Sequence, residues 1–298
     1  MTPSAFQTAL LARRRSRLRH HRASLRGEFM ALDNVTVRVQ VTHRLGTSDE
    51  TIVVVPDPPN LIEHHQPVVD RLAPDFRVIC LELPGFGFSH PGPGFGYTID
   101  EQASALAKVL DHLGVRNATL EMACLGAFVG MRLAERRPDI LRRLILLQVP
   151  SYHEARLWSR RADLCGIIAT PWLGQVFMEL ADTLVVRHWY HAALPQGHNE
   201  ATCQRHARLA LEGFRRGGCF CLASAYQALQ RGADYPTCRL GQETVVLWGS
   251  ADQTHRHTDK QSIRRQIPQA RVVEFEDCGH FPSLEATDRY LSIVQRTL

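Results

Sequence analysis

Three side chains that could act together on an acyl group each follow a predicted strand: Cys124, Asp252 and His280. Ligands in open α/β sheets bind at the carboxyl ends of the strands, so we expect these side chains to share one cleft. A histidine oriented by a carboxylate can take the proton of a thiol, and the thiolate can then attack an acyl carbon to form a thioester. The residue types and their order along the chain therefore predict covalent acyl chemistry at Cys124.

The segment LEMACLGAFVG, residues 120–130, has the pattern of a strand that runs through a tight turn into a helix rich in small residues. Cys124 stands at the apex of this turn, where a side chain projects into the cleft. A helix expected over residues 125–136 would place the partial positive charge of its N-terminus beside the sulfur. That charge favours the thiolate form of the cysteine.

Strand-like and helix-like segments alternate along most of the chain. The run TIVVVP at residues 51–56 is continuously apolar, as in a buried central strand, whereas VTVRVQV at 35–41 alternates. This succession predicts an α/β fold with a mostly parallel central sheet and helices on both faces. Further strands are expected over 76–91, 118–123, 142–148, 244–250 and 271–280, and further helices over 100–113, over 258–266 and from 284.

The same patterns divide the chain into three parts. Residues 1–30 form a basic N-terminal extension, and residues 31–150 together with 239–298 carry the α/β pattern. Residues 151–238 contain only helical patterns, which indicates a helical cap inserted before the strand that bears Asp252. We expect the tryptophans of this cap to pack mainly in its own core.

From about residue 30 to residue 298 the chain resembles the α/β-hydrolase fold family, in particular its branch with a helical cap. LELPGFGFSHP is similar to the family's strand-and-turn signature, LWGSADQ to its acid-bearing loop and CGHFPSLE to its histidine loop. The resemblance implies that Asp252 is the acid and His280 the base. It also implies that Cys124 occupies the position of the nucleophile at the strand-to-helix elbow.

Two positions near the nucleophile depart from the family's pattern. The family's elbow reads G-x-S-x-G, whereas this chain has Met122 and Cys124 in place of the first glycine and the serine. In VVVPDPPN, residues 53–60, Pro58 stands where the family has a backbone N–H that stabilises the oxyanion, and proline has none. Loss of one such donor costs about 2.7–4 kcal/mol of transition-state stabilisation.

Three groups are candidates for replacing or completing the oxyanion site. They are the backbone N–H of Leu125, the side-chain amide of Asn60 and the backbone N–H of Asp57. The carboxyl group of Asp57 has two interpretations of equal weight. It could act as a general acid or orient a substrate hydroxyl, or it could cap a turn between prolines.

The formal net charge of +5 does not indicate a nucleic-acid partner. Residues 1–30 carry a net charge of +6, so the remaining residues sum to −1, and the body of the protein is close to neutral. Leu11, Leu18 and Leu25 recur every seven residues within the basic segment. A helix there could dock on an acidic partner or a membrane surface, pack on its own domain, or serve as an organelle transit peptide.

The eight cysteines and fifteen histidines show no metal-ligand spacing, so we expect neither a metal nor another cofactor. His64–His65 and His255–His257 lack a third ligand at a telling distance, and we expect the latter pair in a solvated loop. Cys80 is expected in the core and Cys278 is expected to be inert. Without a secretory or membrane-spanning pattern, the expected location is cytoplasmic, with reduced thiols.

Three functions remain open at this point. The first is a hydrolase, or an acyltransferase, that acts on a small ester, thioester or other activated acyl substrate through a Cys-His-Asp triad. The second is a non-hydrolytic lyase, eliminase or cyclase in which His280 moves protons and Asp57 assists, which the altered oxyanion loop favours. The third is a non-catalytic binding protein with the same fold.

Overall fold

A mixed sheet runs through the middle of the molecule, which this computed structural model describes over residues 2–42, 50–195, 200–232, 235 and 240–297. Its first three strands in spatial order pair antiparallel, and every later pairing along the sheet is parallel. The strands lie in the order β1 (Glu28–Leu32), β2 (Val35–Val41), β4 (Arg77–Leu81), β3 (Thr51–Val54), β7 (Ala118–Ala123), β8 (Leu141–Leu147), β10 (Glu243–Gly249) and β11 (Arg271–Phe275). The expected fold, an α/β-hydrolase sheet that is mostly parallel, is confirmed.

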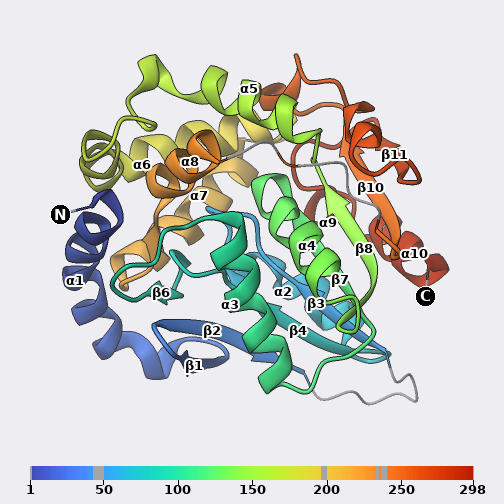
Figure 1. The fold of residues 1–298 in the computed structure, drawn as a ribbon, viewed down its shortest axis with the longest axis horizontal. Coiled ribbons are helices and arrows are strands. Elements are labelled where there is room, and N and C mark those ends of the chain that lie inside the picture. Colours follow the sequence, from blue (N-terminus) through green and yellow to red (C-terminus); the bar gives the residue numbers. More distant parts are fainter. Residues whose placement is uncertain (1, 43–49, 196–199, 233–234, 236–239, 298) are drawn as a thin grey trace.

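Helices cover both faces of this sheet, which explains why its central strands are apolar on both sides. Every residue of β3 and β7 is buried. One face carries α3 (Ile99–His112) and α4 (Cys124–Arg136), and the other carries α2 (Ile62–Leu72), α9 (Pro282–Glu285) and α10 (Thr287–Thr297) (Figure 1). The start of α3 is fixed by a capping box, in which Thr98 accepts a hydrogen bond from the backbone of Glu101 and the Glu101 carboxylate accepts from that of Thr98.

Residues between β8 and β10 form a helical segment beyond one end of the sheet (Figure 1). Its short strand β9 (Cys219–Phe220) pairs with β5 (Phe86–Gly87) in the turn after β4, which joins the segment to the core. The predicted boundary at 238/239 and Cys238 lie outside the described residues, so the division into domains stays a prediction. The helices are α5 (Tyr152–Ala162), α6 (Leu173–Ala193), α7 (Glu200–Arg215) and α8 (Leu222–Arg231).

The basic N-terminal segment forms helix α1 (Pro3–His21), which packs on this helical segment. Leu11 and Leu18 are buried, as the seven-residue spacing indicates, and Arg14 is buried between them. The Arg14 guanidinium pairs with Glu179 at 3.0 Å and with Asp182 at 2.9 Å, both on α6. Docking of the remaining arginines on an acidic partner or a membrane stays a prediction.

One expected helix is much shorter in the structure. In place of a helix over 258–266, the chain forms a single 3₁₀ turn at Ser262–Arg265. Pro268 limits any continuation, because the residue before a proline is disfavoured in helical conformation. Among the described residues, no helix is both long enough and apolar enough to cross a bilayer, and this includes the 21-residue α6.

Candidate active site

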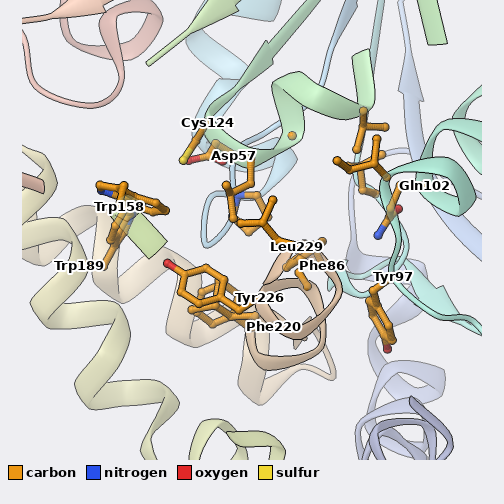
Figure 2. Close-up of a pocket in the computed structure, with 18 of the residues that line it drawn as sticks. Asp57, Phe86, Tyr97, Gln102, Cys124, Trp158, Trp189, Phe220, Tyr226 and Leu229 are labelled. Atoms are coloured by element: carbon orange, nitrogen blue, oxygen red, sulfur yellow. The ribbon is translucent and has the colours of Figure 1, made fainter. Parts of the chain in front are cut away.

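Cys124 stands at a strained turn between β7 and α4. Its φ of +50° lies in the left-handed region, which residues other than glycine seldom adopt. The side chain is 5% exposed and lines a cavity between the sheet and the helical segment (Figure 2). The strand-to-helix elbow expected from the sequence is therefore present, with the sulfur on the cavity side.

Met122 replaces the small residue that such an elbow usually has, and the helix accommodates it with glycines. A Cβ at Gly130 would lie 3.1 Å from the Met122 sulfur, and one at Gly126 would lie 3.4 Å from its terminal methyl group. Methionine is unbranched and fills irregular space. The pair of glycines in α4 therefore provides the room that the first elbow position lacks.

Asp252 follows β10 and accepts four hydrogen bonds. The donors are the backbone N–H of Thr254 at 2.8 Å, its hydroxyl at 2.7 Å, the amide of Gln148 at 2.8 Å and Nδ1 of His280 at 2.7 Å. Burial by itself raises the pKa of this carboxyl, but His280 and Thr254 outweigh it and lower the pKa to about 2. Asp252 is therefore ionised and fixed in place.

His280 is fully buried between two carboxylates. Nδ1 faces Asp252, and Nε2 lies 3.2 Å from Oδ2 of Asp57. Burial alone lowers the pKa of an imidazole, yet Asp252, Asp57 and Cys124 together raise the pKa of His280 well above its usual range. The resting imidazole therefore carries a proton.

The loop that holds His280 is tied both to α9 and to the helical segment. Glu285 accepts the backbone N–H groups of Gly279 and Phe281, each at 2.8 Å. The backbone N–H of His280 donates to the carbonyl of Ala193 at the end of α6, at 2.8 Å. A Cβ at Gly279 would lie 2.1 Å from that same carbonyl, so only glycine fits there.

Cys124 is close to His280 but is not yet a thiolate. Its sulfur, a ring nitrogen of His280 and a ring nitrogen of His255 all lie within 4.8 Å of one another. Burial and the charge of Asp57 raise the pKa of the Cys124 thiol, while His280 and the backbone N–H of Leu125 oppose this rise. The resting site therefore holds a thiol beside an imidazolium–carboxylate pair.

The residues of the oxyanion loop lie in different places. Asp57 and Pro58 line the cavity, as does Leu125, whereas Asn60 is not among its lining residues. The side-chain oxygen of Asn60 accepts a hydrogen bond from Tyr190 at 2.8 Å, on the side of α6. Asp57 thus reaches His280, whereas Asn60 donates its backbone N–H to the Asp57 carbonyl at 2.9 Å and directs its side-chain oxygen to Tyr190.

The cavity has a volume of about 110 Å³ and an apolar wall. Figure 2 shows Cys124 and Asp57 together at one end, Trp158 and Trp189 beside them, and Tyr97 and Gln102 at the far end. The wall is otherwise aliphatic and aromatic, with Leu83, Phe86, Ile99, Val129, Val185, Phe220, Leu222, Ala225, Tyr226 and Leu229.

Sequence reasoning missed four groups at this site. Trp158 and Trp189 line the cavity, although the sequence favoured a role in the core of the helical segment. His255, expected in a solvated loop, is only 3% exposed and stacks on Trp158 with ring centroids 4.8 Å apart. Gln148 holds Asp252, and its place directly after β8 was the one signal that could have identified it.

The other thiols of the described residues are free, and two of them bear on the sequence interpretation. Cys80 is fully buried in β4, and burial raises its pKa well above the usual range. Burial also raises the pKa of Cys278 to about 11. Of the cysteines in the described residues, Cys124 is the one that lines the cavity.

Comparison with known proteins yields relatives that share the fold and differ in chemistry. A cis-3-alkyl-4-alkyloxetan-2-one decarboxylase of Shewanella oneidensis is 25% identical over 83% of this chain and 81% of its own length. A 2-hydroxymuconate semialdehyde hydrolase of a Pseudomonas species is 27% identical over 76% of this chain and 78% of its own. A thermophilic esterase from Thermogutta terrifontis superposes with a TM-score of 0.69 at 21% identity, covering 91% of this chain and 97% of that one.

A family-wide sequence pattern agrees with these relatives. The pattern described as "Alpha/beta hydrolase family" matches residues 52–293, which include the elbow, Asp252 and His280. The decarboxylase and the semialdehyde hydrolase are enzymes, which supports an enzyme over the non-catalytic alternative. The chain is therefore an enzyme that belongs to the alpha/beta hydrolase family.

Proposed function

We propose that this enzyme hydrolyses an ester, thioester or other activated acyl substrate through an acyl-cysteine at Cys124, and that it transfers the acyl group where an alcohol or amine replaces water. The observation that carries the proposal is the position of the Cys124 sulfur. It lies at the strained elbow, on the wall of the cavity and within 4.8 Å of His280. The apolar wall favours an apolar acyl group.

In the proposed reaction the thiol proton passes to the pair formed by His280 and Asp57. The sulfur attacks the acyl carbon, the bond to the leaving group breaks, and the stored proton is given to the departing alcohol or thiol. Water then attacks the thioester while the same pair takes its proton, and the sulfur leaves and is protonated again. Each proton returns to its starting place after one turnover.

In this proposal the side chain of Asp57 replaces the backbone N–H donor that Pro58 lacks. Burial raises the pKa of the Asp57 carboxyl, although His280 opposes this, so the group is suited to take up a proton. Once protonated, it is a hydrogen-bond donor at the cavity wall beside Cys124. In this proposal the Asp57 hydroxyl and the backbone N–H of Leu125 together stabilise the oxyanion.

Mass spectrometry of the intact protein tests this function. After exposure to p-nitrophenyl esters of graded chain length, we expect one acyl adduct, which peptide mapping assigns to Cys124. Cys124→Ala should abolish the adduct, whereas Cys165→Ser should keep it, because Cys165 is an exposed thiol away from the cavity. An unmodified Cys124, with ester turnover unchanged in Cys124→Ala, would disprove the proposal.

A second function, non-hydrolytic proton-transfer chemistry in the same cavity, is favoured by one observation. His280 contacts a second carboxylate, Asp57, where the loop lacks a backbone donor at Pro58. Such an enzyme would use His280 and Asp57 to move protons within the substrate and would not need the sulfur. Cys124→Ala would then retain most of the activity, while His280→Ala and Asp57→Asn would each lose it.

A further inference from the structure

Cys124, His255 and His280 come from three separate elements and converge at the part of the cavity wall that Cys124 forms. Cys124 lies at the elbow, His255 in the turn after β10, and His280 in the loop after β11. The sulfur and one ring nitrogen of each histidine lie within 4.8 Å of one another, and all three side chains are buried. Hydrolytic chemistry through Cys124, His280 and Asp252 uses no part of His255.

His255 has no hydrogen-bond partner on either ring nitrogen among the described residues, although it is 97% buried. Its faces are occupied, since the ring stacks on Trp158 at an interplanar angle of 4° and meets Trp248 edge-on. Packing therefore explains why the ring of His255 is buried, but it leaves both ring nitrogens without a hydrogen-bond partner among the described residues. Buried polar atoms of folded proteins nearly always have a partner, which makes two unpaired nitrogens an indication of a missing ligand.

The donor set suits a particular class of ion. One thiolate and two imidazoles are ligands of borderline-soft divalent metals such as Zn²⁺, which binds in tetrahedral sites with an open position when three ligands come from the protein. Nδ1 of His280 already donates to Asp252, so Nε2 is the atom left for a metal. A carboxylate behind a ligating histidine is the usual outer partner in zinc sites.

From these observations we infer that Cys124, His255 and His280 form a binding site for a zinc-class divalent ion, and that occupancy of this site switches off covalent chemistry at Cys124. Binding replaces the thiol proton, which is released to solvent, with a metal–sulfur bond. The proton on Nε2 of the His280 imidazolium is released to solvent as well, and Nε2 then binds the ion. Asp57 lies beside this site, with Oδ2 3.2 Å from Nε2 of His280.

Cobalt provides a direct readout of this site. The chelator-treated full-length chain is titrated with Co²⁺, and we expect a thiolate-to-cobalt charge-transfer band together with the visible bands of a tetrahedral ion. Competition with a chelating dye then measures the affinity for Zn²⁺. Cys124→Ser should remove the charge-transfer band, while Cys165→Ser should keep it.

His255→Phe separates this inference from a structural role, because phenylalanine keeps the ring stack on Trp158 and removes both nitrogens. We expect zinc to bind this variant more than about 100-fold more weakly, since even partners outside the ligand shell contribute 10–100-fold. His257→Phe in the same loop is the matched control, because His257 is exposed, and its affinity should equal that of the unaltered chain.

The outcome is independent of the proposed hydrolysis. A charge-transfer band that depends on both Cys124 and His255 supports the metal site even where no acyl adduct forms. Two results would overturn the metal site and leave the proposed function in place. In the first, the unaltered chain forms the adduct but shows no charge-transfer band. In the second, it forms the adduct but His255→Phe binds zinc as tightly as the unaltered chain does. Where both hold, Zn²⁺ should prevent the adduct and chelation should restore it.

Discussion

Asp57 reaches His280 from the side of the cavity, opposite Asp252. The imidazole therefore stands between two carboxylates, 2.7 Å from one and 3.2 Å from the other. Asp252 is ionised and held by four donors, whereas burial raises the pKa of Asp57. In the proposed reaction the two carboxyl groups have different roles, because Asp252 orients the ring and Asp57 exchanges protons with the cavity.

Asp57→Asn tests whether the Asp57 carboxylate accepts a proton during the reaction. An amide keeps the size of the side chain but cannot accept the thiol proton, so we expect kcat for ester hydrolysis to fall by about 10²-fold or more. Steady-state kinetics with a chromogenic ester measures the effect. Asp75→Asn, at an exposed carboxylate, is the control, and an Asp57→Asn enzyme of normal kcat would exclude a catalytic Asp57.

Gln148 is the corresponding positioning residue on the other side. Its amide donates to Asp252, and its carbonyl oxygen accepts the backbone N–H of Gly249 at 2.7 Å. Gln148→Glu removes the donor and places a second negative charge beside Asp252. We expect a several-fold lower kcat with an unchanged KM, because Gln148 is not among the residues that line the cavity, and a higher KM alone would contradict this role.

At the scale of elements, the junction of β7 and α4 depends on the fit of Met122 over Gly130. Gly130→Ala gains about 1 kcal/mol of helix propensity but crowds the methionine sulfur at 3.1 Å, and overpacking costs about 1–3 kcal/mol. We expect a net loss of about 1 kcal/mol in the free energy of unfolding, measured by urea denaturation.

The same substitution in a Met122→Ala background should be less destabilising, because the nearer crowding atom is gone and only Cδ2 of Leu120, at 3.2 Å, remains. A double-mutant cycle should therefore give a coupling energy of about 1 kcal/mol or more. Gly241→Ala is the matched control, since a Cβ at Gly241 meets nothing within 4 Å. Strict additivity of the two substitutions would show that Met122 does not need the space above Gly130.

The main elements could be predicted because their patterns are local. The buried strand β3 lies in a continuous apolar run, and α3 has both periodicity and a capping box. The helix α2 was not foreseen, since Pro67 and the paired histidines 64 and 65 interrupt an apolar periodicity. The expected helix at 258–266 is reduced to a 3₁₀ turn, and Asp259 at its start instead accepts the backbone N–H of Gln261 at 2.9 Å, a local turn that competes with a helix.

The site residues that directly follow strands could be predicted from the sequence. The residues that reach the site only through contacts between distant parts of the fold could not. Cys124, Asp252 and His280 all come after central strands, so topology alone brings them to one edge. Trp158 and Trp189 lie on helices whose rotation about their own axes no local signal fixes. The contact between Asp57 and His280 spans over two hundred residues, and no spacing rule reports it.

At the scale of the whole molecule, one buried carboxyl connects the sheet to the last helix. Glu121 in β7 accepts a hydrogen bond from the Tyr290 hydroxyl of α10. Burial raises the pKa of Glu121 to about 7, although Tyr290 and Ser283 oppose the rise. The folded protein therefore favours the protonated carboxyl, and this stabilisation is complete below the unfolded pKa and is lost as the pH rises through about 7.

Glu121→Gln removes this dependence, because an amide stays neutral at every pH. Between about pH 5 and about pH 8 the unaltered chain should lose up to about 3 kcal/mol of stability that the variant does not lose. Chemical denaturation at the two values measures the difference, with the exposed Glu276→Gln as control. Parallel pH profiles of Glu121→Gln and the unaltered chain would contradict a raised pKa.

Helix α6 meets three parts of the molecule at once: Arg14 of α1 along its side, the cavity at Trp189, and the backbone of His280 at its last carbonyl. Because a helix is stiff, a shift at one of these three contacts is transmitted to the other two. Any displacement of α6 that widened the cavity at Trp189 would therefore also disturb the hydrogen bond from the His280 backbone N–H to the Ala193 carbonyl. The position of this one helix thus couples access to the cavity to the placement of the imidazole.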